Sequence, residues 1–303
     1  MLLPLKAPLE SGAVLIGDGA MGTELQRAGL EPGGCGDAWN LTHPDKVFGI
    51  QRAYVEAGSQ LLITNTFGSN RFALARYGLE SRAAELCRAG AQIARQAMGK
   101  NGWVLGDVGP CGGFLEPLGE ITPEQLEESL HEQIGGLLYG GADGIILETM
   151  SAPEEVEIGI RVAREMGAPC VIASLTFDLA RGIYQTNTYQ TMMGVAPEQA
   201  ASAAVDAGAD VVGANCGRLE PGEFIEIARS FRSACDVPLM LQPNAGQPRL
   251  EGAAILYPVS PQEMATALLA LTEYAQIVGA CCGSTPDHIR AFSDQLSASE
   301  PKN

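Results

Sequence analysis

The sequence predicts a single (β/α)₈ barrel of the TIM type, because short apolar runs alternate with helix-like segments along its whole length. The runs are nearly continuous in Val, Ile and Leu, which suits parallel strands that are buried on both faces. Eight such runs occur, at residues 13–18, 60–65, 103–108, 144–149, 170–177, 210–215, 239–244 and 277–282. A doubly wound open sheet is the alternative architecture.

The segments between the runs carry helix start and stop signals. Several open with Ser or Thr before Pro, a pair that suits the N-cap and the first helical position. Helical spacing is clearest at residues 44–58, 122–141, 196–208 and 260–275. A helix end, a Gly and a strand follow one another in "EAGSQLLITN", "GGADGIILET" and "DAGADVVGAN". Because Gly accepts the left-handed conformation that ends a helix, this echo indicates one βα unit used repeatedly.

The chain reads as one domain. No linker, low-complexity segment or change of composition divides the 303 residues. We therefore predict a single domain over residues 1–303, with its core at about 12–295. The turn "GDGAMGTE" after the first run is a poor match to the G-x-G-x-x-G fingerprint, which argues against the nucleotide-binding form of an open sheet.

Composition and charge exclude several classes of partner. Hydrophobic residues make up 46% of the chain and charged residues 18%, as in soluble globular proteins. The net charge of −17 repels phosphate backbones and anionic lipids, so we predict neither nucleic-acid nor membrane partners. The N-terminus "MLLPLKAPLESG" lacks the apolar core of a signal peptide, and we predict a cytoplasmic location.

Polar residues stand where the predicted strands end. In barrels of this kind the active site lies at the carboxyl ends of the strands. Any single residue of this kind has about even odds of only capping a helix or closing a loop, but the whole set predicts a polar ring around the barrel mouth. Its members are Asp18, Asn65, Thr66, Phe67, Asp107, Glu148, Thr149, Thr176, Phe177, Asp178, Asn215, Cys216, Asn244, Cys281 and Cys282.

Three of the eight cysteines belong to this ring. Cys216 directly follows the sixth run, and Cys281 and Cys282 end the eighth, so only one strand separates them in a closed barrel. Gly283 permits the turn that lets both neighbouring thiols face inward. Three convergent thiols in a reducing compartment favour Zn²⁺, and we predict Cys216, Cys281 and Cys282 as catalytic ligands of a single zinc ion. The remaining cysteines are interpreted as structural: Cys35, Cys87, Cys111, Cys170 and Cys235.

The ligand type indicates the chemistry. Three thiolates make zinc a poor Lewis acid and a poor activator of water, whereas hydrolytic zinc sites usually carry neutral His ligands. An electron-rich zinc instead keeps a fourth sulfur ionised and nucleophilic at neutral pH, which indicates alkyl transfer to a thiol. Two other classes stay open: a barrel lyase or hydrolase with a redox or structural Cys pair, and a non-catalytic module that binds thiols or a corrinoid partner.

Several sequence motifs are similar to those of a known family. They are "DGAMGTELQ", "DAWNLTHPDKV", "AYVEAGSQLLITNTFGSNR", "GDVGP", "GANCG", "PNAG" and "GACCGSTPDHIR", in this order. Over roughly residues 12–295 the chain resembles the zinc-dependent homocysteine S-methyltransferases. "WNLTHP" and "TNTFG" resemble the homocysteine-binding module of cobalamin-dependent methionine synthase more than the betaine or S-methylmethionine branches. The resemblance implies methyl transfer to the thiol of homocysteine, giving methionine.

The resemblance also implies roles for particular residues. Cys216, Cys281 and Cys282 match the family's zinc ligands. Asp18 and Glu148 match the acidic residues that hold the amino group of homocysteine, in keeping with the carboxylate that an ammonium group needs. With these two, the full set of predicted substrate residues is Asp18, Gly19, Ala20, Thr66, Glu148 and Asn244.

Backbone N–H groups near Gly19, Ala20 and Thr66 are candidates for holding the substrate carboxylate, and the carbonyl of Asn244 is a candidate for the open zinc position. Within 303 residues we do not expect the folate and cobalamin modules of a full-length methionine synthase. The expected methyl donor is therefore methylcobalamin on a separate corrinoid protein, with S-methylmethionine or betaine as the alternative. The segment 178–194 is an expected part of the donor surface.

Overall fold

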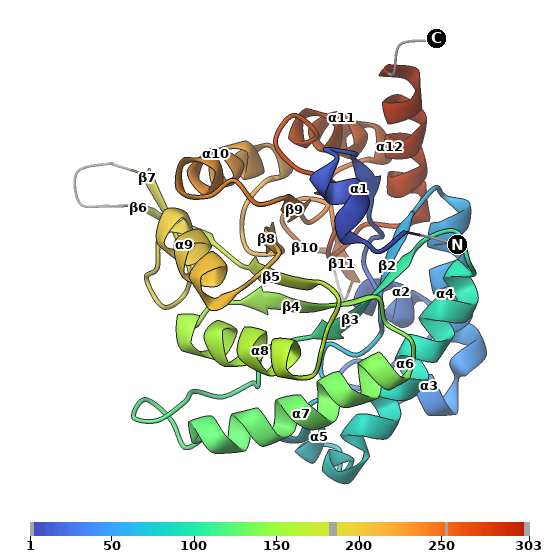
Figure 1. The fold of residues 1–303 in the computed structure, drawn as a ribbon. Helices are drawn as coiled ribbons and strands as arrows, with labels where there is room; N and C mark the ends of the chain where they lie inside the picture. The colour runs from blue at the N-terminus through green and yellow to red at the C-terminus, as the bar shows by residue number, and fades with distance from the viewer. Residues whose placement is uncertain (1–2, 182–186, 252–253, 300–303) are drawn as a thin grey trace.

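The computed structural model describes residues 3–181, 187–251 and 254–299 (Figure 1). All eight predicted strands are present and form one parallel sheet in the order β1-β12-β9-β8-β5-β4-β3-β2. In chain order they are β1 (Leu15–Ile16), β2 (Leu61–Ile63), β3 (Trp103–Val108), β4 (Gly144–Met150), β5 (Val171–Leu175), β8 (Val211–Asn215), β9 (Leu239–Gln242) and β12 (Ile277–Val278). The order confirms the predicted barrel topology.

Each strand of the barrel is followed by an outer helix, as Figure 1 shows. Along the chain these are α4 (Pro44–Glu56), α6 (Ala83–Met98), α7 (Pro123–Tyr139), α8 (Pro153–Glu165), α9 (Pro197–Ala207), α10 (Phe224–Ala234), α11 (Pro261–Leu271) and α12 (Pro286–Ser299). Thr122 and Ser260 form capping boxes before the prolines of α7 and α11. Gly58, Gly141 and Gly208 follow α4, α7 and α9 with φ of 113°, 99° and 106°, so the predicted stop signals are confirmed.

The barrel closes between β1 and β2, the two ends of the sheet order. The Gln60 N–H donates to the Ile16 carbonyl at 2.8 Å. Just beyond, the Ile63 N–H donates to Asp18 Oδ2 at 2.8 Å, so a side chain takes over the role of the missing ladder bond. The closure excludes the open sheet, and it places Asp18 at the barrel mouth.

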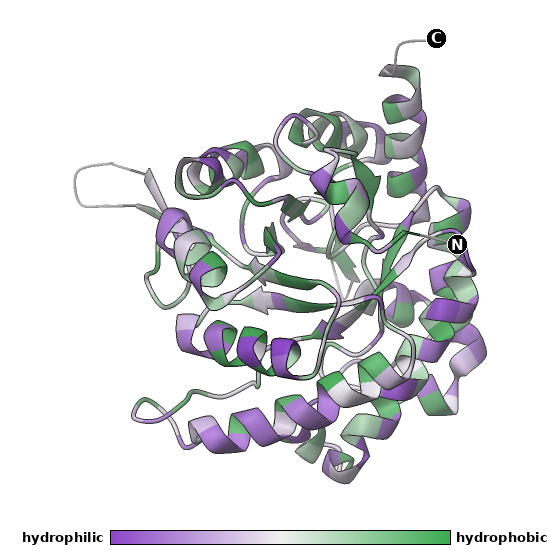
Figure 2. Ribbon diagram, in the orientation of Figure 1, coloured by the Kyte–Doolittle hydropathy of each residue, from purple (hydrophilic) through white to green (hydrophobic). Residues whose placement is uncertain are grey.

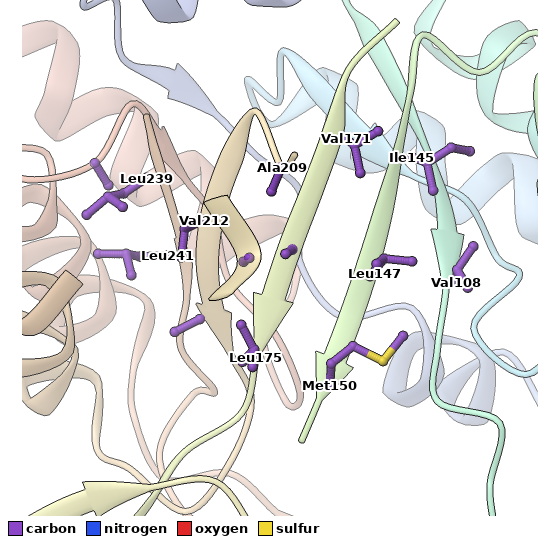
Figure 3. Close-up of a cluster of buried hydrophobic side chains, with 14 of the residues drawn as sticks. Val108, Ile145, Leu147, Met150, Val171, Leu175, Ala209, Val212, Leu239 and Leu241 are labelled. Carbon is purple, nitrogen blue, oxygen red and sulfur yellow. The ribbon is translucent and has the colours of Figure 1, made fainter. Parts of the chain in front are cut away.

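Two apolar layers hold the barrel together. One fills its interior and is closed at the amino end by Leu5 and by Leu9 of α1 (Lys6–Glu10). The other lies between the sheet and the helices, where Figure 3 shows Ile145, Leu147 and Val171 among the outward-facing side chains. Figure 2 shows mainly hydrophobic residues along the strands, and both hydrophobic and hydrophilic residues along the outer helices. The interior therefore offers polar groups chiefly at the carboxyl ends of the strands.

The loops that follow the strands contain short helices and two hairpins. They are α2 (Gly22–Arg27), α3 (Trp39–Thr42), α5 (Arg71–Ala75), η1 (Glu80–Arg82), η2 (Pro221–Glu223), and the hairpins β6 (Asp178–Arg181) with β7 (Asn187–Gln190) and β10 (Arg249–Glu251) with β11 (Ala254–Leu256). The expected donor segment 178–194 carries the first hairpin, and residues 182–186 of it lie outside the described residues. No helix within the described ranges has the length and apolar character needed to cross a membrane. The extent of the single domain stays a prediction.

Candidate metal centre and substrate site

The three predicted cysteine ligands meet at the barrel mouth. Cys216 Sγ lies 3.9 Å from Cys282 Sγ, which lies 4.0 Å from Cys281 Sγ, and all three sulfurs are within 4.8 Å of one another. Tetrahedral zinc with bonds of about 2.3 Å places its sulfur ligands about 3.8 Å apart, so the trio matches one face of such a site. Among the described residues, no other three His, Cys, Asp or Glu side chains are grouped in this way.

Unusual backbone conformations aim these sulfurs. Cys216 directly follows β8 with φ of 57°, a left-handed conformation that is uncommon outside glycine. Gly283 follows the cysteine pair with φ of 79°, and a Cβ there would lie 1.9 Å from the ring of Tyr257. The chain therefore leaves β8 at Cys216, whereas β12 already ends at Val278 and the predicted turn at Gly283 follows the cysteine pair. The sequence did not indicate that Tyr257 packs against this turn.

The thiols strongly affect one another's ionisation. Cys216 Sγ contacts Cys282 Sγ, to which Cys281 donates, and the two neighbouring thiols lower the pKa of Cys216 to about 3. The same contact with Cys216 raises the pKa of Cys282 to about 12 and raises that of Cys281. A single thiolate is thus stable among the three sulfurs on their own. Ionisation of all three needs a divalent cation between them, and a soft thiolate set of this kind suits zinc.

Asn244, which follows β9, places its side-chain amide near Cys216. Its Nδ2 donates to the Gly217 carbonyl at 2.9 Å, and its side chain also bonds to Cys216. Its Oδ1 is buried and has no hydrogen-bond partner among the described residues. An unpartnered buried oxygen is costly, and here it is a ligand type that zinc accepts. The amide of Asn244 thus lies beside Cys216, and its role at the open metal position stays a prediction.

Three carboxylates line the mouth beside the cysteines: Asp18, Asp107 and Glu148. Burial raises the pKa of Asp18 and of Asp107 well above their usual range, and it raises the pKa of Glu148 to about 7. Asp107 bonds to Glu148, and Oδ1 of both aspartates is buried with no hydrogen-bond partner among the described residues. Such a cluster favours a cationic ligand group. Asp107 was predicted only as a member of the ring, because its contact with Glu148 is not visible in the sequence.

Two of the backbone donors expected for a substrate carboxylate already have partners. The Ala20 N–H donates to Ser284 Oγ at 3.0 Å, and the Thr66 N–H donates to the Thr64 carbonyl at 2.9 Å. Gly19 is closely packed, since a Cβ on it would lie 2.5 Å from Ser284 Oγ. A substrate carboxylate at this turn would compete with these partners.

A cavity of about 540 Å³ opens beside the sulfurs. Cys216 and Thr149 form its wall toward the metal site, and the loops after β3, β4, β5 and β8 form the rest. Glu155 and Asp178 add carboxylates to the lining, and Arg218 adds a guanidinium group. Of the three cysteines, Cys216 lines the cavity.

Curated proteins with similar sequences include two methionine synthases. Methionine synthases from Mycobacterium leprae and Mycobacterium tuberculosis are 35% and 34% identical to it, over 91% and 92% of the chain. The chain spans only about a quarter of the length of these relatives, 24% of each. Homocysteine methyltransferase MmuM from Escherichia coli, in its metallated form, is 21% identical and has the same fold, with a TM-score of 0.76 over 97% of this chain and 100% of that one.

A family sequence model also matches this chain. The model described as homocysteine S-methyltransferase matches residues 15–296, which spans the barrel from β1 to α12. The match covers most of the 303 residues and includes all three cysteines of the trio. It confirms the resemblance inferred from the motifs. The chain therefore belongs to the homocysteine S-methyltransferase family.

Proposed function

We propose that this protein transfers a methyl group to the thiol of homocysteine, giving methionine, at a zinc ion held by Cys216, Cys281 and Cys282. The observation that carries the proposal is the convergence of three sulfurs from two strand ends to within 4.8 Å of one another. Zinc bound there would lower the pKa of the homocysteine thiol, so that its sulfur is a thiolate at neutral pH. Asn244 Oδ1 would serve the fourth position until the substrate sulfur arrives.

The remaining residues hold and orient the amino acid. Asp18 and Glu148 receive its ammonium group, because a buried carboxylate forms strong charge-assisted hydrogen bonds with such a donor. The substrate carboxylate lies at the Gly19–Ala20 turn and at Thr66, where it replaces the present partners of those N–H groups. The substrate sulfur then attacks the methyl carbon in line with the leaving group. A sulfur–carbon bond forms, and the electron pair of the breaking bond leaves with the donor.

For the methyl donor we propose methylcobalamin carried by a separate corrinoid protein. The cavity beside Cys216 opens onto the loops after the strands, where Phe114 and Met192 are 49% and 71% exposed and can contact a partner. Glu155 and Asp178 favour the alternative of a small cationic donor, S-methylmethionine or betaine, within the same cavity. We also propose a cytoplasmic location, which is supported by eight free cysteines.

A panel of donors tests the function and identifies the donor. The zinc-loaded protein is incubated with homocysteine and, in turn, methylcobalamin, S-methylmethionine, betaine and S-adenosylmethionine, and methionine is measured. Methionine with one donor supports the proposal. Tight homocysteine binding without methyl transfer from any donor would instead indicate a binding module.

Cysteine substitutions test the metal. Metal analysis of Cys216→Ser should show loss of zinc together with loss of activity, because two remaining sulfurs do not complete the site. Cys235→Ser is the matched control, since Cys235 is also partly exposed and lies outside the trio. Full turnover by Cys216→Ser would contradict zinc-dependent transfer and favour a lyase or hydrolase.

A further inference from the structure

A single buried amide contacts both halves of the proposed substrate site. Asn215, the last residue of β8, is 1% exposed. Its Nδ2 donates to Glu148 Oε1 at 3.3 Å and to Cys281 Sγ at 3.9 Å. Glu148 is the proposed anchor for the substrate ammonium group, and Cys281 is a proposed ligand of the metal that receives the substrate sulfur. One nitrogen atom therefore links the two groups that receive the two ends of homocysteine.

The strand that carries Glu148 is irregular at this point. Leu147 of β4 pairs with Ala173 of β5, and Met150 pairs with Leu175, so β4 contains one extra residue between the two pairs. Bulges of this kind occur beside active sites and change the direction of a side chain. Thr149 in the bulge has φ of 57°, which is a genuine outlier for a β-branched residue.

The side-chain amide of Asn215 forms hydrogen bonds with this bulge. Its Oδ1 accepts from the Thr149 N–H at 3.0 Å and from Ser174 Oγ at 2.6 Å. One of the two Nδ2 hydrogens points to Thr149 Oγ1 at 2.7 Å, so the longer contacts with Glu148 and Cys281 share the other. Because only the carbonyl end of the amide can accept from a backbone N–H, the Thr149 bond fixes the orientation of the amide. Strained conformations persist where neighbouring groups over-determine them, and Asn215 bonds both the backbone and the side chain of Thr149.

We propose that Asn215 is a positioning residue that sets the distance between the Glu148 carboxylate and the metal-bound sulfur. The inference rests on the proposed function. A short chain joins the ammonium group and the sulfur of homocysteine, so both anchors must be correctly spaced for the two ends to bind together. Small displacements of such anchors have large effects in enzymes. Asn215 thus makes the site selective for a thiol that carries an amino group at this distance.

The substitution Asn215→Asp tests the proposal. It keeps the side-chain size and the acceptor for Thr149, but it places a carboxylate oxygen where the donor now faces Glu148 and Cys281. Calorimetric titration compares homocysteine with 4-sulfanylbutanoic acid, which lacks the amino group. Repulsion from the new carboxylate displaces Glu148, so we expect the affinity for homocysteine to fall at least about tenfold and that for 4-sulfanylbutanoic acid by less than about threefold. Metal analysis should show an unchanged zinc content.

Asn40→Asp is the matched control. Asn40 is also a buried amide, but it bonds to the backbone carbonyls of Asn65 and Leu86, so the ratio of the two affinities should stay as in the wild type. If Asn215→Asp does not fold, Thr149→Val removes the Oγ1 acceptor and keeps the β-branched shape, and the ratio should shift in the same direction. Equal weakening of both thiols, an unchanged ratio, or loss of zinc would overturn the proposal. Wild-type protein that binds neither thiol would overturn the proposed function, and the inference with it.

Discussion

The substitution Gly283→Ala should disturb the cysteine turn by a calculable amount. Gly283 has φ of 79°, and a Cβ there would lie 1.9 Å from the ring of Tyr257, closer than real Cβ contacts. A non-glycine residue in the left-handed region costs about 1–2 kcal/mol. Overpacking against a fixed neighbour costs about 1–3 kcal/mol more. The free energy of unfolding should therefore fall by about 2–5 kcal/mol, a large part of the roughly 5–15 kcal/mol typical of a domain.

A second glycine separates the two contributions. Gly12 has the same φ of 79°, but a Cβ on it would have no atom within 4 Å, so Gly12→Ala should carry only the backbone cost. Urea unfolding of both variants measures the difference, provided that the m-value is unchanged. In Gly283→Ala/Tyr257→Ala the clash is gone, and the double substitution should cost less than the sum of the single ones. Equal midpoints for Gly12→Ala and Gly283→Ala would refute the packing argument.

Four other changes have defined outcomes. Glu148→Gln should weaken homocysteine binding about 10- to 100-fold in calorimetry, because a hydrogen bond to a charged group contributes about 1.5–3 kcal/mol; unchanged affinity would count against Glu148 as the ammonium anchor. Burial lowers the pKa of His288 below its usual 6.5, so the unfolded state binds the extra proton, and the free energy of unfolding should fall as the pH drops through about 6.5. His288→Gln should flatten that pH dependence, and an unaltered profile would contradict it. Thr122→Ala removes the cap of α7 and should lower the free energy of unfolding in urea by about 1 kcal/mol. An unchanged free energy of unfolding would contradict this role for Thr122. Chelation of zinc should lower the Tm and added zinc should restore it, whereas an unaffected Tm would argue against a metal bound to the folded state.

The sequence alone predicted the barrel and grouped the three cysteines that we propose as metal ligands. Buried parallel strands need continuous apolar runs, and Pro and Gly mark helix ends, so strands such as β3 and helices such as α7 are visible locally. The sulfurs were predictable because strand ends of a closed barrel converge. Cys216 and the Cys281–Cys282 pair needed only their positions along the chain to be grouped.

Only the tertiary structure decided how the polar groups around the three sulfurs are paired. The Ala20 N–H is bonded by Ser284, 264 residues away, and Asn215 reaches Thr149 across 66 residues. The bulge at Thr149 and the pairing of Asp107 with Glu148 likewise depend on neighbouring strands. No local pattern encodes such contacts, because each depends on the side-chain directions of two segments that become neighbours only when the barrel closes.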